Sequence, residues 1–140
     1  METELAPYIF FKGNAREAFE FYQSVFGGEL KTQTNDQTPK DVQGQMGVND
    51  ENRNQLMHAR LEGGLVVLMG SDSKNASDHS AKVELSISGT DEAKLKEVFS
   101  KLAAGGEVRM PLSEQFWGDT FGMLTDKYGV DWMFNISSAA

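Results

Sequence analysis

The 140-residue sequence contains no cysteine. This absence excludes disulfides, thiolate zinc sites, iron–sulfur clusters and a cysteine nucleophile. The sequence also has no apolar run that approaches the ~20 residues needed to cross a bilayer. Its first residues, Met1 to Glu4, are acidic and lack the basic flank and apolar stretch of a signal peptide. We therefore expect a cytoplasmic protein with no membrane partner.

Basic residues are in short supply. The chain has 13 Lys and Arg against 21 Asp and Glu, which gives a formal net charge of −8. Such a charge repels phosphate backbones and anionic membranes, so we expect no nucleic-acid partner. Hydrophobic residues make up 39% of the chain, which is enough for a globular core and argues against disorder. The length is that of one ordinary domain.

The sequence repeats one order of signals in its two halves. In the first half, an aromatic and β-branched strand over Leu5–Phe11 is followed by Gly13 and then by apolar residues at helical spacing. Gly27-Gly28 ends that predicted helix, and Glu29–Thr34 reads as a further strand. The second half repeats this order at a nearly constant offset, with a strand at Lys82–Ser88, Gly89, a helical stripe from Leu95 to Leu102, Gly105-Gly106 and a strand at Val108–Leu112.

Two hairpins complete the halves. Leu56–Leu61 and Leu65–Met69 flank a glycine turn, and Met123–Thr125 and Val130–Ile136 flank another. Each half is therefore predicted as a βαβββ module, and the chain as an α+β protein. The segment Thr34–Asn54 is poor in large aliphatic residues, so it is a lid, a mobile segment or the place of a hidden short strand.

Several motifs along nearly the whole chain resemble one family. They are Pro7-Tyr8-Ile9-Phe10-Phe11, Gly13-Asn14-Ala15, Ala18-Phe19-Glu20-Phe21-Tyr22, Phe26-Gly27, Met57-His58-Ala59, Leu68-Met69-Gly70-Ser71-Asp72, Phe116-Trp117-Gly118 and Asp126-Lys127-Tyr128-Gly129-Val130-Asp131-Trp132. In these motifs the sequence resembles the PhnB-like, or glyoxalase-like, branch of the vicinal oxygen chelate superfamily. That superfamily includes glyoxalase I, extradiol dioxygenases and bleomycin-resistance proteins.

The resemblance implies a particular architecture. It implies a single glyoxalase-like domain over residues 1–140, with one module at about 1–72, a linker at about 71–80 and a second module at about 81–140. The two βαβββ modules would form a curved mixed sheet with a concave ligand cleft, and the helices would lie on the convex side. It also implies a homodimer, which the exposed sheet edges of such modules favour independently.

The resemblance also locates the metal-binding positions of the superfamily. In metal-dependent relatives, His and Glu ligands come from the first, fourth, fifth and eighth strands. Here those positions fall at Pro7, Leu68 (or Met69 beside it), Lys82 and Met133. None of these side chains binds a hard divalent cation well. We therefore expect no metal at that position and no cofactor, although His58 and His79 leave a different metal arrangement open.

Strand alternation and the resemblance together predict what lines the cleft. The predicted ligand-binding residues are Ile9, Phe11, His58, Arg60, Leu68, Asp72, Lys82, Glu84, Phe116, Trp117 and Met133. This mixture of apolar and polar groups suits a small amphipathic ligand, including an anionic one. Simpler interpretations stay open, because the charged members can form surface ion pairs, Asp72 can cap a turn, and the two adjacent aromatic residues can be core or dimer contacts.

Three functions are compatible with these features. The first is a small-molecule-binding, glyoxalase-like protein without the usual metal ligands. The second is an enzyme of the superfamily, of lyase, isomerase or dioxygenase type, with a non-standard or metal-free site in which His58 and Glu84 transfer a proton. The third is a dimeric scaffold without a ligand. The residues alone do not decide whether the protein is an enzyme, and they do not identify a substrate.

Overall fold

The structure is a computed structural model that describes residues 3–73 and 83–138. It divides into two compact units, Met1–Ser77 (unit 1) and Asp78–Ala140 (unit 2). Most of the predicted linker, together with His79 and Lys82, lies outside the described residues.

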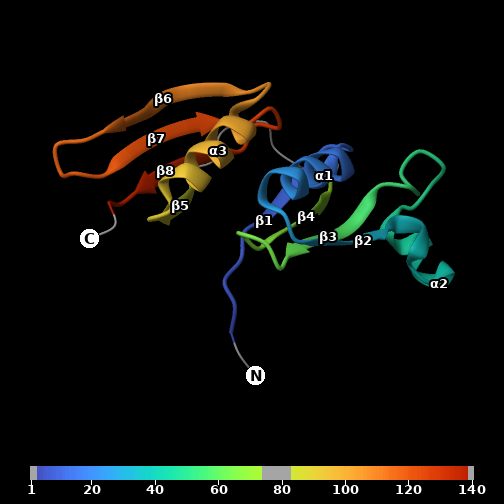
Figure 1. Ribbon diagram of the computed structural model, residues 1–140. Helices are drawn as coiled ribbons and strands as arrows, with labels where there is room; N and C mark the ends of the chain where they lie inside the picture. The colour runs from blue at the N-terminus through green and yellow to red at the C-terminus, as the bar shows by residue number, and fades with distance from the viewer. Residues whose placement is uncertain (1–2, 74–82, 139–140) are drawn as a thin grey trace. The chain divides into compact units, whose positions relative to one another are not determined.

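Unit 1 contains one mixed sheet and the helix that covers one of its faces (Figure 1). Its elements are β1 (Tyr8–Phe11), α1 (Ala15–Phe26), β2 (Glu29–Thr34), the 3₁₀ helix η1 (Asn35–Gln37), α2 (Lys40–Met46), β3 (Leu56–Glu62) and β4 (Leu68–Asp72). The strand order is β1-β4-β3-β2, with β1 parallel to β4 and the other pairs antiparallel.

Unit 2 repeats this arrangement. Its elements are β5 (Leu85–Gly89), α3 (Glu92–Ala103), β6 (Glu107–Glu114), β7 (Thr120–Thr125) and β8 (Asp131–Ile136). The strand order is β5-β8-β7-β6, with β5 parallel to β8. The prediction of an α+β protein built from two βαβββ modules is therefore confirmed.

The repeated Gly-Gly-Glu segments have a steric cause. A Cβ placed on Gly28 would lie 2.5 Å from the carbonyl oxygen of Glu62, and one on Gly106 would lie 2.3 Å from that of Thr125. In each unit the chain that leaves the helix thus passes directly against the backbone at the end of the third strand. Only glycine permits this approach, which is why the pattern recurs at the same place in both modules.

The segment 34–54 holds short helices and no hidden strand, which corrects one of the three alternatives; a lid and a mobile segment remain predictions. The segment contains η1 and α2. Pro39 precedes the first turn of α2, Asp41 lies within that turn, and Gly47 ends the helix in the left-handed conformation with φ 73°. These are ordinary helix boundary signals. The low content of large aliphatic residues in this segment nevertheless gives it no apolar helical stripe, so these boundary signals alone did not predict a helix.

Candidate functional site

Each sheet has one face that packs against α1 or α3; we call the opposite face the open face of that unit. In unit 1, Phe11 is 4% exposed and Leu68 is 2% exposed. The ring of Phe11 makes an edge contact with Phe19 of α1, with ring centroids 6.0 Å apart. Ile9 shares the strand face of Phe11 because side chains alternate along β1.

This placement corrects the predicted cleft wall. Ile9, Phe11 and Leu68 point toward the helix and not toward the open face. The sequence did not reveal this, because every residue from Tyr8 to Phe11 is apolar or aromatic and neither face of the strand is marked by polar residues. Met69, the neighbour of Leu68, lies on the open face, where it is paired in register with Tyr8 and Arg60.

The open face of unit 1 carries an aromatic cluster that the sequence did not single out. Tyr8 is 39% exposed and Phe10 is 58% exposed, and their ring centroids are 5.1 Å apart. The ring of His58 stacks on Tyr8 at 5.9 Å, with the Tyr8 Oη and His58 Nδ1 atoms 3.5 Å apart. We call Tyr8, Phe10 and His58 the aromatic platform. Of its members, only His58 was predicted as a site residue.

Beside the platform, the cations of the open face are held by carboxylates. Arg60 forms ion pairs with Glu4 at 2.8 Å and with Glu62 at 3.0 Å, and Lys31 pairs with Glu62 at 2.9 Å. Hydrogen bonds from Lys31 and then Arg60 lower the pKa of Glu62, and the hydrogen bond with Glu62 raises the pKa of Lys31. The Glu62 and Glu4 carboxylates likewise raise the pKa of Arg60. Arg60 therefore lies on the open face, and its charge is already balanced by Glu4 and Glu62.

Asp72 is occupied by backbone contacts. Its Oδ1 atom accepts hydrogen bonds from the backbone N–H groups of Gly13 and Ala15, both at 2.9 Å, and its Oδ2 atom accepts one from Leu56 at 2.9 Å. The carboxylate thus joins the end of β4 to the start of α1 and of β3. Asn14 is the residue before α1 and is of a type that often caps helices, yet its side chain makes no capping bond, and Asp72 takes that role.

Methionines cross the open face of unit 2 in one row. Met110 of β6 is paired in register with Met123 of β7, which is paired with Met133 of β8. All three are half-buried, and the residues that alternate with them, such as Leu124 and Trp132, are buried. Met133 therefore occupies the open face of unit 2, and its predicted contact with a ligand remains a prediction.

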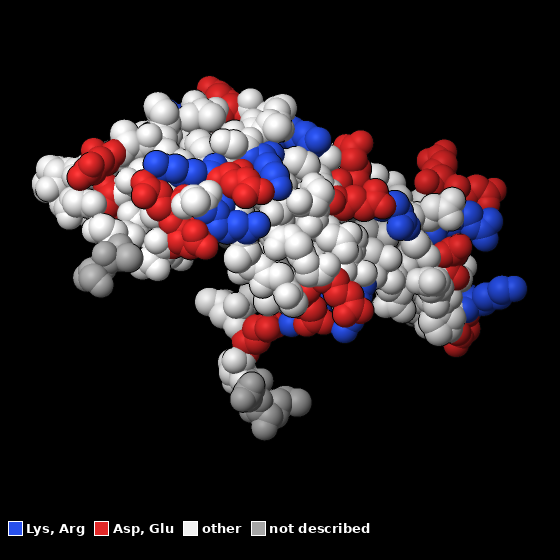
Figure 2. All heavy atoms as spheres, in the orientation of Figure 1, with Lys and Arg blue, Asp and Glu red and all other residues white. Residues whose placement is uncertain are grey.

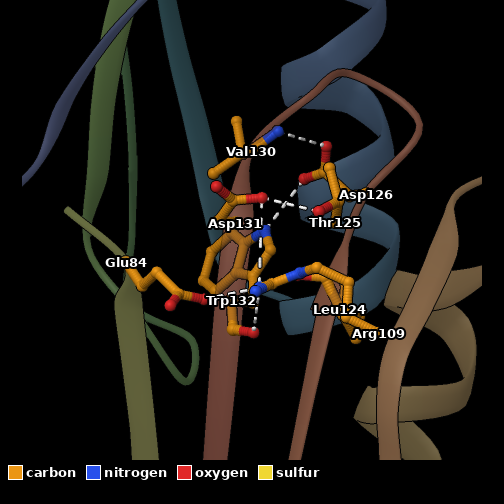
Figure 3. Close-up of polar contacts among 8 residues, drawn as sticks. All are labelled: Glu84, Arg109, Leu124, Thr125, Asp126, Val130, Asp131 and Trp132. Carbon is orange, nitrogen blue, oxygen red and sulfur yellow. Dashed lines mark hydrogen bonds and ion pairs between the residues drawn. The ribbon is translucent and has the colours of Figure 1, made fainter. Parts of the chain in front are cut away.

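Next to this row, Arg109 joins three strands (Figure 3). Its Nη2 atom lies 2.5 Å from the Glu84 carboxylate and 3.9 Å from that of Asp131, and it donates to the carbonyl oxygen of Leu124 at 3.0 Å. Glu84, a predicted site residue, is therefore one half of an ion pair. Arg109 was missed because it lies at an irregularity of β6 between Val108 and Met110, where alternation does not assign its face.

Phe116 and Trp117 lie at the tip of the β6–β7 hairpin. They are 97% and 50% exposed, and their ring centroids are 4.9 Å apart. Trp117 also contacts Phe121 at 6.3 Å. Because both side chains are exposed, they do not belong to the hydrophobic core. Their predicted roles in contacting a ligand or a second copy of the chain remain predictions.

The residues at the positions that the resemblance implied for a metal do not suit a hard divalent ion. Pro7 has no side-chain ligand atom, and Met133 offers only a thioether. Leu68 is buried on the helix side, so its neighbour Met69, another thioether, takes the place on the open face. Among residues 3–73 and 83–138, no group of three or more His, Cys, Asp or Glu is placed so that it could hold a metal ion.

The charged surface is mixed in sign. On the face shown in Figure 2, Lys and Arg side chains are interspersed with Asp and Glu rather than gathered into one basic patch. In the described part of the chain, no helix has the length and apolar character required to cross a membrane.

Comparisons with known proteins agree on one superfamily. The family described as the Glyoxalase/Bleomycin resistance protein/Dioxygenase superfamily matches residues 5–134. Protein YjdN of Escherichia coli K12 is 34% identical, and the match covers 94% of each chain.

Two solved structures are similar over almost their full length. Protein PA1353 from Pseudomonas aeruginosa is 34% identical, covers 99% of this chain and 100% of its own, and superposes with a TM-score of 0.81. A PhnB protein from Bacillus cereus, described as a putative 3-demethylubiquinone-9 3-methyltransferase, is 26% identical over 96% of this chain and 100% of its own, with a TM-score of 0.70.

Proposed function

The chain belongs to the Glyoxalase/Bleomycin resistance protein/Dioxygenase superfamily, and from that premise we propose that it binds a small planar organic molecule on the aromatic platform of unit 1. The observation that carries the proposal is the exposure of Tyr8 and Phe10, 39% and 58%, on a sheet face away from the helix. Exposed apolar side chains that lie together on a sheet face mark a site of contact with a ligand or a partner. Planar molecules are the ligands that such rings stack on.

The charges beside the platform indicate a ligand without a strong negative charge. Arg60 is paired with both Glu4 and Glu62, so a carboxylate ligand would have to displace an existing partner. His58 remains in contact with Tyr8 and offers a ring nitrogen for hydrogen bonding to a polar group of the ligand. A neutral aromatic compound with one polar group therefore fits better than the anionic ligand that the sequence suggested.

We propose that this binding proceeds without a divalent ion at the superfamily's metal position, because Pro7, Leu68 and Met133 do not supply oxygen or nitrogen ligands. The methyltransferase activity in the name of the B. cereus protein is not part of the proposal. In this chain β1 leads into α1 through a turn with a single glycine, and Asp72 already accepts the first backbone N–H of the helix.

The test is a titration of the protein with neutral planar compounds, namely indole, 2-naphthol and quinoline, followed by two-dimensional amide NMR. We expect saturable shifts at β1 and at His58, and a dissociation constant at least fivefold higher for the variant Phe10→Ala. Because Phe10 is exposed, this variant keeps the fold. The charged analogue 2-naphthoate is expected to bind more weakly than 2-naphthol.

Leu65→Ala is the control, since it removes an apolar side chain of unit 1 that is 49% exposed and lies between β3 and β4, outside the aromatic platform. It should leave the affinity for 2-naphthol unchanged. The proposal is refuted if Phe10→Ala and Leu65→Ala bind alike, or if none of the three compounds causes saturable shifts on β1.

A further inference from the structure

Every methionine among the described residues of unit 2 lies in the same row of its open face. The row consists of Met110, Met123 and Met133, one from each of three adjacent strands and in direct register. All three residues are half-buried, so each keeps some of its surface accessible to solvent. The hydrophobic core of the unit is on the other face, where Leu124, Trp132 and Phe134 are almost completely buried.

We propose that this row binds a soft monovalent cation, Cu(I) or Ag(I), through its thioether sulfurs. Thioethers are soft, neutral ligands that select Cu(I) over hard and borderline cations. Residues directly opposite on adjacent antiparallel strands have Cβ atoms about 4.5–5.5 Å apart. Because methionine has three rotatable bonds, sulfurs from three neighbouring strands can converge on one ion above Met123.

The charges next to the row favour a cation. Next to the methionine row lies a second row of paired residues, in which Glu107 is paired with Thr125, and Thr125 with Asp131. Together with Glu84 these acids place three carboxylates near the row, against the single guanidinium of Arg109 that pairs with two of them. The neutral thioethers do not cancel the charge of a bound ion, so a net negative surrounding adds to its binding.

This site differs from the metal centre of the metal-dependent relatives. Only Met133 coincides with one of the superfamily's metal positions, and Met110 and Met123 come from other strands. A site made only of thioether sulfurs should also select Cu(I) or Ag(I) over Zn²⁺ and Ni²⁺, because Zn²⁺ and Ni²⁺ in proteins require nitrogen, oxygen or thiolate ligands. The site is built from residues of unit 2 alone, whereas the aromatic platform is built from residues of unit 1.

The experiment is a titration of the full chain with Ag(I), and with Cu(I) under anaerobic conditions in competition with a chromophoric Cu(I) chelator. We expect one ion per chain and no competition by Zn²⁺ or Ni²⁺. The variant Met123→Leu removes the central sulfur at nearly constant volume, and it should weaken binding at least tenfold. Met110→Leu and Met133→Leu should each weaken it too, and they provide further variants if the first is unstable.

Met69→Leu is the control, because it removes a thioether from the open face of unit 1. It should leave the affinity unchanged. X-ray absorption at the copper edge should show sulfur neighbours only. The proposal is overturned by an unchanged affinity in Met123→Leu, by equal weakening in Met69→Leu, or by nitrogen and oxygen neighbours at the ion. The proposed binding of planar compounds is tested separately, by titrating wild type and Phe10→Ala with 2-naphthol. Either proposal can therefore fail while the other holds.

Discussion

The carboxylate of Asp72 provides the sharpest test of how unit 1 is held together. In the variant Asp72→Ala, the backbone N–H groups of Gly13, Ala15 and Leu56 lose the acceptor that each has at 2.9 Å. Loss of a helix N-cap costs about 0.5–2 kcal/mol. Hydrogen bonds to a charged group contribute about 1.5–3 kcal/mol where the donor stays buried.

Gly13 is exposed, so water replaces its lost bond, whereas Ala15 and Leu56 are 0% and 1% exposed and their N–H groups are less readily solvated. We therefore expect a loss of about 2–4 kcal/mol in the free energy of unfolding of unit 1, a large part of the 5–15 kcal/mol typical of a domain. Asp72→Asn keeps one carbonyl oxygen as an acceptor and should lose less than Asp72→Ala.

The contrasting variant is Asn14→Ala. Asn14 precedes α1 in sequence, but its side chain makes no capping bond, so the change should cost less than about 0.5 kcal/mol. The measurement is urea denaturation followed by amide hydrogen exchange within α1, which reports on unit 1 by itself. Equal destabilisation by Asn14→Ala and Asp72→Ala would refute the reasoning, as would a loss below about 0.5 kcal/mol for Asp72→Ala.

Further predictions concern stability, assembly and motion. Because its ion pairs lower the folded pKa of Glu62, their stabilisation is present above the ordinary glutamate value of 4.5 and is lost as the pH falls through the folded value. Glu62→Gln should thus lower the melting temperature at pH 7, and the difference from wild type should vanish once the pH is below the folded pKa of Glu62. Gly106→Ala places a Cβ against the backbone of Thr125 and should destabilise the protein in thermal melts, whereas Gly44→Ala in α2 meets no atom and should stabilise it by about 0.5–1 kcal/mol. Light scattering at micromolar concentration should give the mass of a homodimer; a monomer would contradict the expectation drawn from the sheet edges. Amides of segment 34–54 should exchange faster than those of β5, and equal protection would show that α2 is held more firmly than its composition indicates.

The amino-acid sequence by itself determined the order of the strands and of the helices α1 and α3, but it did not reveal η1 and α2. Alternation in β8 separates Trp132 and Phe134, which are buried, from Met133 and Asn135, which are not. The two Gly-Gly-Glu segments marked the end of each helix, and the repeat revealed two modules. These signals are local, since side-chain periodicity and glycine turns depend on neighbouring residues only.

The tertiary structure decided which faces and partners the side chains have. Tyr8 and Phe10 lie on the open face while Phe11 contacts α1, and a run of apolar residues does not distinguish these faces. Asp72, rather than the adjacent Asn14, caps α1, because the parallel pairing of β1 with β4 brings the end of β4 to the start of the helix. Register across strands likewise aligns Met110, Met123 and Met133, which are far apart in the chain. Such contacts depend on strand pairing, and strand pairing is set by the packing of the whole unit rather than by local sequence.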